Sequence, residues 1–73
     1  MKNFRLKELR LKNNIQQKEL AELFDILPRT FRKWETQEID IPSSKLIALA
    51  QYFNVSLDYL VGIDDVPNRK NNQ

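Results

Sequence analysis

The sequence predicts one all-α domain of five helices over residues 1–63, followed by a polar, flexible tail over residues 64–73. The chain has 73 residues with one glycine and three prolines, too few turn residues for the closely spaced strands of a sandwich or barrel. Its apolar residues recur at helical spacing, for example Leu27, Phe31 and Trp34 at i, i+4 and i+7. Residues that start or stop helices separate these apolar groups.

The first two expected helices cover residues 4–13 and 17–24. In the first, Leu6 and Leu9 lie three positions apart and form one apolar face. Asn14 follows this helix and suits the left-handed conformation that often ends one. The second helix has an apolar face that we expect to be buried, made of Leu20, Ala21 and Phe24.

The third expected helix covers residues 28–35. Pro28 fits its first position, where the missing N–H would have no partner within the helix. Its apolar side is formed by Leu27, Phe31 and Trp34, with Leu27 packed against Phe31. The remaining side is polar and mostly basic, and it consists of Arg29, Thr30, Arg32 and Lys33.

The fourth expected helix covers residues 44–53, and a fifth begins after Ser56 and ends at Gly62. Asn54 suits a left-handed stop between the two helices, and Ser56 suits an N-cap. The fourth helix has an apolar face of Leu46, Leu49, Ala50 and Phe53.

The missing residue types exclude several kinds of chemistry. The sequence has no cysteine and no histidine, which removes disulfides, cysteine-ligated zinc and the commonest general base. Asp64 and Asp65 are the only adjacent carboxylates, and we expect them to form a solvated turn. The longest apolar run, Leu46 to Ala50, is too short to cross a membrane, and the first residues lack a signal-peptide pattern. We expect a cytoplasmic protein without enzymatic activity, cofactor, metal or membrane partner.

The basic residues gather in two places, although the formal net charge is only +2. Residues 1–18 carry six basic residues and one acidic residue, and residues 29–33 carry three basic residues and no acidic one. This distribution is compatible with a polyanionic partner, and it is also typical of solvated helix faces.

Three runs of residues follow one another in a specific order. They are Gln17-Lys18-Glu19-Leu20-Ala21-Glu22-Leu23-Phe24-Asp25-Ile26, then Thr30-Phe31-Arg32-Lys33-Trp34-Glu35, and, after Pro42, Val55-Ser56-Leu57-Asp58-Tyr59-Leu60-Val61-Gly62. Over about residues 4–62 the chain resembles the lambda and 434 repressor and Cro family of DNA-binding domains. The resemblance implies a compact five-helix, lambda-repressor-like fold with a helix-turn-helix, whose third helix enters the major groove.

The resemblance implies a bacterial or phage-type transcriptional regulator, in the first place a repressor, that binds double-stranded DNA in a sequence-specific way. It assigns a phosphate contact to Gln17 and base contacts to Pro28, Arg29 and Lys33. Arg29 could bond bidentately to guanine, whereas Pro28 offers only apolar contact with a thymine methyl. Contacts to the DNA backbone fall to Thr30 and Arg32.

The resemblance also implies structural features. It places Arg10 and Glu35 in an ion pair, which we expect to be exposed and therefore to contribute about 0–1 kcal/mol. Four positions where the family commonly has glycine hold Asn14, Asp25, Gln37 and Asn54. Asn and Asp tolerate positive φ, so we expect only the turn at Gln37 to differ in shape.

For assembly, the resemblance points to the region of the fifth helix, with Leu57, Tyr59 and Val61 as interface residues of a weak homodimer that pairs cooperatively on DNA. An alternative is a helix-turn-helix module that contacts proteins, such as an antitoxin or anti-regulator. The acidic loop over residues 35–40 favours this alternative, as do Phe4 and Leu11. We expect those two side chains to pack against the fifth helix or the tail.

Overall fold

The computed structural model describes residues 4–67, and these residues form five helices without a strand. The all-α prediction is confirmed. The helices are α1 (Leu6–Lys12), α2 (Gln17–Leu23), α3 (Pro28–Thr36), α4 (Ser43–Phe53) and α5 (Leu57–Leu60).

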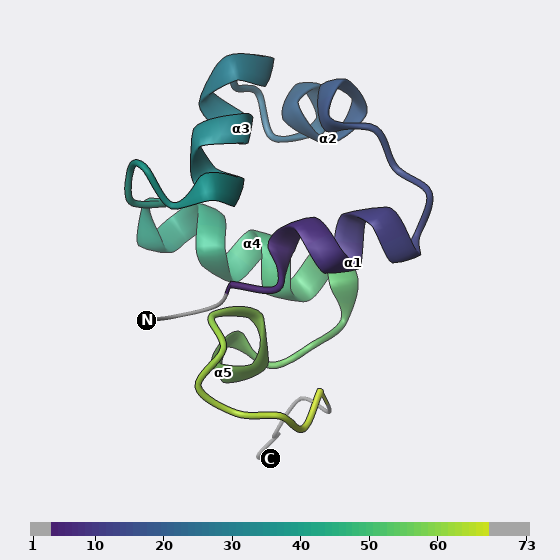
Figure 1. The fold of residues 1–73 in the computed structure, drawn as a ribbon, viewed down its shortest axis with the longest axis vertical. Coiled ribbons are helices and arrows are strands. Elements are labelled where there is room, and N and C mark those ends of the chain that lie inside the picture. The colour runs from purple at the N-terminus through teal and green to yellow at the C-terminus, as the bar shows by residue number, and fades with distance from the viewer. Residues whose placement is uncertain (1–3, 68–73) are drawn as a thin grey trace.

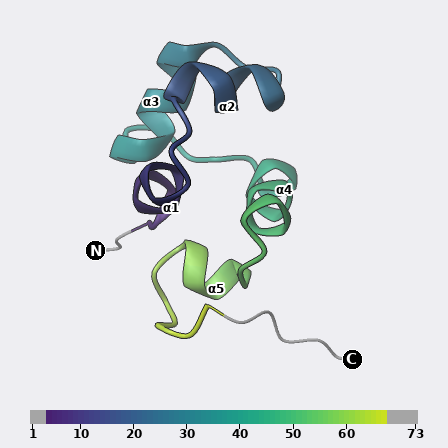
Figure 2. The ribbon, with the colours of Figure 1, turned by 90° about the vertical axis from the view of Figure 1, so that its right-hand side faces the viewer.

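The helices are arranged in three levels (Figure 1). α2 and α3 pack against each other at the upper end of the molecule, and α5 lies at the lower end. α1 and α4 run across the middle, and both are seen nearly end-on in Figure 2. The pair α2 and α3 is therefore held at one extremity of the fold by the helices beneath it.

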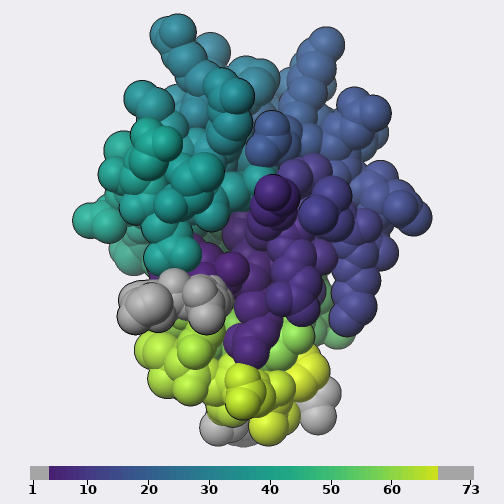
Figure 3. Space-filling model, viewed as in Figure 1, coloured from purple at the N-terminus to yellow at the C-terminus, as the bar shows by residue number. Residues whose placement is uncertain are grey.

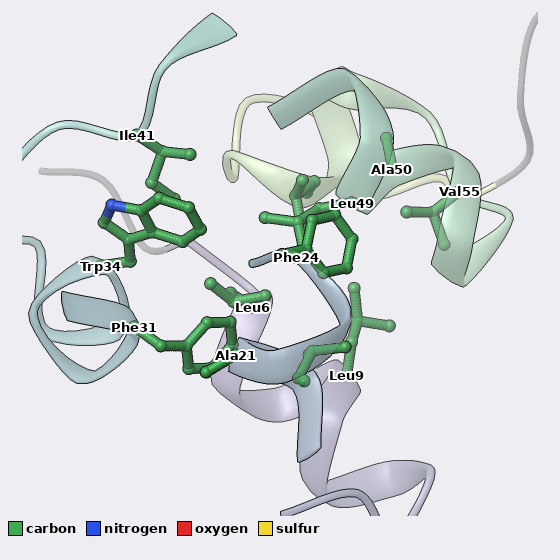
Figure 4. Packing of buried hydrophobic residues seen from close by; sticks show 12 residues of the cluster. Leu6, Leu9, Ala21, Phe24, Phe31, Trp34, Ile41, Leu49, Ala50 and Val55 are labelled. Carbon is green, nitrogen blue, oxygen red and sulfur yellow. The ribbon is translucent and has the colours of Figure 1, made fainter. Parts of the chain in front are cut away.

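The core is made of side chains from all five helices and the loops between them. Figure 4 shows Trp34 beside Ile41, and Phe31 beside Ala21. Phe31, Leu20 and Leu49 are completely buried, which agrees with the predicted faces. The buried apolar residues are Leu6, Leu9, Leu20, Ala21, Phe24, Phe31, Trp34, Ile41, Leu49, Ala50, Val55 and Leu60.

Leu27 is not part of this core, so the prediction that it packs on the apolar side of α3 is wrong. Its side chain is 55% exposed. The neighbouring Ile26 is the residue of this turn that packs, partly buried, against the core. Leu27 has extended backbone angles just before α3, which turn its side chain out of the apolar stripe that Phe31 and Trp34 continue.

Four non-glycine residues in the described part of the chain have positive φ, and they end helices or shape the turns between them. The predicted left-handed residues Asn14, Asp25 and Asn54 have φ of 57°, 59° and 56°. Gln37 has φ of 65° as well, so the prediction of a different turn shape there is wrong. The fold requires the left-handed conformation at the end of α3 although glutamine has no special tolerance for it.

The start of the chain is bonded to its later part, and α1 begins at Leu6 and not at the predicted Phe4. The amide of Arg5 donates to the carbonyl of Leu60 at 2.7 Å, and this bond joins the start of α1 to the end of α5. Phe4 is partly buried against the core. Leu11 is 55% exposed, so the expectation that it packs is wrong.

Arg5 also fixes the segment that follows α5. Its guanidinium donates to the carbonyls of Tyr59 at 2.7 Å and Asp64 at 3.0 Å, pairs with Asp65 Oδ1 at 2.7 Å, and lies 4.1 Å from the centre of the Tyr59 ring. The Asp65 side chain is solvated as expected, with 94% exposure, whereas Asp64 is half-buried and its carbonyl is bonded to Arg5. The expected tail is bonded to the domain as far as Pro67, whose carbonyl accepts from the Ser56 amide. Its residues 68–73 lie outside the described part.

Candidate nucleic-acid interface

The turn between α2 and α3 is closed by backbone hydrogen bonds. The amide of Ile26 donates to the Ala21 carbonyl at 3.0 Å, and left-handed Asp25 donates to Glu22 at 3.1 Å. Leu27 then takes extended backbone angles, and α3 begins at Pro28. Two helices joined in this way by a short turn have the geometry of a helix-turn-helix unit.

Two aromatic residues fix α3 to the body of the domain. Phe31 is 0% exposed and Trp34 is 2% exposed, and their ring centroids lie 6.0 Å apart. Lys45 of α4 supports α2 from below, because its Nζ donates to the Phe24 carbonyl at the end of that helix, at 3.0 Å. A cation is favourable at this negative end of the helix dipole. The α2–α3 unit is thus attached to the rest of the domain on its lower side, and its upper side forms the outer surface of the molecule (Figure 3).

The outward side of α3 is cationic, as predicted. Arg29, Arg32 and Lys33 are exposed, and Thr30 is half-buried. Within residues 4–67 no side chain pairs with any of the three cations, and their charged groups form no hydrogen bond there. These three charges are therefore available to a partner outside the domain.

A buried ion pair joins α1 to the end of α3. Arg10 Nε lies 2.6 Å from Glu35 Oε2, and Arg10 Nη1 donates to the Ile15 carbonyl at 2.9 Å. The two side chains are 8% and 2% exposed. The pair that the resemblance implied is present, but the expectation that it is exposed is wrong.

Gln17, the residue assigned to a phosphate, lies at the first position of α2 and belongs to the same network. Its Nε2 donates to Glu35 Oε1 at 2.8 Å. The Glu35 carboxylate thereby fixes the side chain at the start of α2 in one orientation. The exposed Lys18 follows directly.

The loop after α3 is acidic on its surface. Glu38 and Asp40 are exposed, and Ile41 after them enters the core. The Glu38 amide closes the end of α3 by donating to the Lys33 carbonyl at 3.0 Å. The loop therefore places negative charge beside the C-terminal end of α3.

The three candidate interface residues near α5 differ in exposure. Leu57 is 40% exposed, Val61 is half-buried, and Tyr59 lies under the Arg5 guanidinium. Leu57 also borders a shallow pocket between α4 and α5, together with Ile47 and Val55. Of the three, Leu57 offers the most accessible apolar surface.

Sequence reasoning missed two features of this surface. One is the exposure of Leu27 at the start of α3, and the other is the attachment of Arg5 to the segment after α5. The exposure of Leu27 follows from its extended backbone just before α3, which the apolar spacing does not reveal. The attachment of Arg5 depends on tertiary contacts. In the described part of the chain, no group of three or more acidic side chains is placed to hold a metal ion. None of its helices has the length and apolar character needed to span a membrane.

The fold and this surface define a helix-turn-helix domain. The sequence model of the Cro/C1-type helix-turn-helix family matches residues 6–60, so the chain belongs to this family. It is similar to YobD, an uncharacterised HTH-type transcriptional regulator of Bacillus subtilis (strain 168), with 33% identity over 66 residues. It is also similar to the HTH-type transcriptional regulator ImmR of the same organism, with 40% identity over 65 residues.

These matches cover 90% and 89% of this chain, but 59% of YobD and 51% of ImmR. The chain thus spans little more than half the length of the curated relatives that it matches.

Proposed function

We propose that this chain binds double-stranded DNA in a sequence-specific way, with α3 in the major groove, and acts as a transcriptional regulator, in the first place a repressor. The observation that supports this most is the outward side of α3, where three unpaired cations stand over the buried Phe31 and Trp34. A rigid cationic helix of this kind suits a polyanionic groove. The proposal includes a cytoplasmic location, where DNA is accessible, and a non-enzymatic role.

The side chains of α3 would divide the work by position. Arg29, in the first turn, can reach a base edge and bond bidentately to guanine O6 and N7. Lys33, one turn later, can reach a base or a phosphate. Thr30 and Arg32 suit contacts to the DNA backbone, which position the helix without reading sequence. Pro28 offers only apolar contact.

Gln17 would act at the DNA backbone from the start of α2. An amide nitrogen has two hydrogens, so the hydrogen bond from Gln17 Nε2 to Glu35 leaves one donor for a phosphate oxygen. The same bond holds the amide in place before DNA arrives. Gln17 would thus lose little conformational entropy on binding.

Assembly on DNA is a further part of the proposal. A helix of about two turns contacts few base pairs, so tight binding calls for two copies on half-sites one helical turn apart, roughly 34–36 Å. Leu57, Tyr59 and Val61 are the proposed contact residues. Because this apolar surface is small, the homodimer should be weak in solution and form cooperatively on DNA.

A second candidate function is a helix-turn-helix module that works by contacting another protein, such as an antitoxin or anti-regulator. The exposed Glu38 and Asp40 favour it, because carboxylates close to α3 are repelled by phosphates. The two candidates differ in one simple outcome. A protein-contact module would enrich no common sequence from a pool of random duplexes.

The proposal is tested by selecting duplexes from a random pool and comparing two single variants on the selected sequence. Arg29→Ala should lose about 5- to 150-fold in discrimination at one or two base pairs, the equivalent of about 1–3 kcal/mol. Arg32→Ala should weaken selected and scrambled duplexes by the same factor. Titrations of each variant with both duplexes measure this. Equal losses for both variants on both duplexes would show that Arg29 does not read a base.

A further inference from the structure

We propose that Leu27 reads the 5-methyl group of a thymine in the major groove, in the base pair next to the one that Arg29 contacts. This inference rests on the proposed function, because it assigns a second specificity-determining side chain to the same surface. It adds a second apolar contact, beside that of Pro28, to the polar contacts described above.

The first step is the position of the side chain. Leu27 lies directly before α3, with φ of −74° and ψ of 145°, and its carbonyl accepts from the Phe31 amide at 3.0 Å. The backbone is therefore fixed, while the side chain is 55% exposed. Figure 1 shows that α3 starts at the upper extremity of the molecule, away from α1, α4 and α5. Leu27 thus projects from a rigid corner.

The second step is that leucine does little for stability at this position. The residue before a helix is usually Ser, Thr, Asp or Asn, whose side-chain oxygen accepts a free amide of the first turn. Leu27 makes no such bond, and more than half of its surface stays in water. A serine would serve the isolated domain better. The apolar side chain therefore suits a contact that forms only when a partner covers it.

The third step is the chemistry of that partner. The exposed side of α3 that begins at this corner carries the unpaired charges of Arg29, Arg32 and Lys33, so the surface that covers it is expected to be a polyanion. In the major groove of DNA the thymine methyl is the distinctive apolar group on the base edges. Residues at the start of a recognition helix reach those edges. An apolar side chain beside a cationic one can thus read thymine beside guanine.

The inference is tested with two random duplex pools, one with thymine and one with deoxyuridine in its place, since deoxyuridine lacks only the methyl group. In the duplex selected from the first pool, one thymine should lower affinity about four-fold when it is changed to deoxyuridine, the loss expected for one buried methyl. Selection from the second pool should lose preference at that base pair.

Two variants separate DNA reading from folding. Leu27→Ser supplies a side chain that can cap α3, so the Tm of this variant should rise by roughly 4–8 °C. The variant should bind the thymine and deoxyuridine forms of the duplex with equal affinity. Leu23→Ser is the matched control, because Leu23 is 62% exposed at the end of α2. It should keep the four-fold preference.

The outcomes separate this inference from the proposed function. If the wild-type chain selects a sequence but binds its thymine and deoxyuridine forms equally, the role of Leu27 is overturned and DNA binding stands. The same holds if Leu27→Ser keeps the preference. If neither pool yields a common sequence, the proposed function fails and the role of Leu27 fails with it.

Discussion

At the scale of single residues, the Glu35 carboxylate holds the functional unit together. It accepts from Arg10 Nε at 2.6 Å, Arg10 Nη2 at 3.3 Å and Gln17 Nε2 at 2.8 Å. These donors come from α1 and α2, whereas Glu35 lies near the end of α3. The buried carboxylate thus fixes the orientation of α2 and α3 relative to α1. A buried charge is tolerated only when it is paired in this way.

Replacing one member of this ion pair should therefore lower the free energy of unfolding more than replacing both members. Arg10→Met should lower the free energy of unfolding by about 3–5 kcal/mol, because it leaves the buried Glu35 carboxylate without its cation. The double variant Arg10→Met with Glu35→Leu should recover most of that loss. Denaturant unfolding measures both values.

The exposed pair of Arg5 and Asp65 supplies the control. The Asp65 side chain is 94% exposed, so Asp65→Asn should change stability by about 0–1 kcal/mol. If the double variant at Arg10 and Glu35 is as unstable as Arg10→Met, the argument about an uncompensated buried charge is incorrect.

At the scale of the elements, the helices are short, with four to eleven residues each, and the residues at their ends determine where each one stops. α3 and α4 both end on a left-handed residue, Gln37 and Asn54. The two differ in chemistry, because asparagine tolerates positive φ and glutamine does not. The end of α3 is thus the more strained of the two.

Substitution by glycine should relieve more backbone strain at Gln37 than at Asn54. Gln37→Gly should raise the free energy of unfolding by about 0.5–1 kcal/mol, because glycine has no Cβ to clash in the left-handed conformation. Little is lost with the Gln37 side chain, whose Oε1 accepts only a long 3.4 Å bond from Phe4. Asn54→Gly is the comparison and should gain less. Urea midpoints that show an equal or larger gain at Asn54 would contradict this.

The starts of α3 and α5 could be predicted from sequence because they depend on local signals. Pro28 begins α3 as expected, and Ser56 caps α5 by accepting from the Tyr59 amide at 3.0 Å. The start of α1 could not be predicted, since Arg5 bonds to residues more than fifty positions away. The outward position of Arg29 could be predicted, because the apolar Phe31 and Trp34 define the opposite, buried face of α3.

Other parts of the site depended on contacts that spacing does not reveal. Leu27 continues the apolar spacing of α3, but it precedes the helix and its extended backbone turns it outward. Glu35 could be paired with Arg10 only through the resemblance, and nothing in the sequence indicated that the pair is buried. The left-handed Gln37 is imposed by the fold against its own preference.

At the scale of the whole molecule, the proposed function requires that two copies assemble on DNA, because a single helix of about two turns contacts few base pairs. The described residues are compact, with principal extents of 34 × 25 × 22 Å. In the proposed DNA complex one α3 would read only one half-site, so the proposed partner is a second copy that meets it through Leu57, Tyr59 and Val61. Tyr59 is covered in part by Arg5, which leaves Leu57 as the residue to test.

The free chain should sediment as a monomer at micromolar concentration and bind a palindromic site cooperatively. Leu57→Ser should keep its affinity for a half-site and lose the cooperativity on the whole site. Leu11→Ser is the control, because Leu11 is 55% exposed but lies on α1, and it should keep both. A tight dimer without DNA, or equal affinity per site for half and whole sites, would refute this assembly.

The most direct test of sequence-specific DNA binding is the affinity for a selected and a scrambled duplex over a series of salt concentrations. Lysine and arginine contacts to phosphates displace counterions, so log affinity should fall linearly with log salt concentration, with a slope of about −0.9 for each phosphate contacted. The selected duplex should bind about 10³-fold or more tightly than the scrambled one throughout. Affinities that do not change with salt, or that are equal for the two duplexes, would contradict DNA recognition by α3.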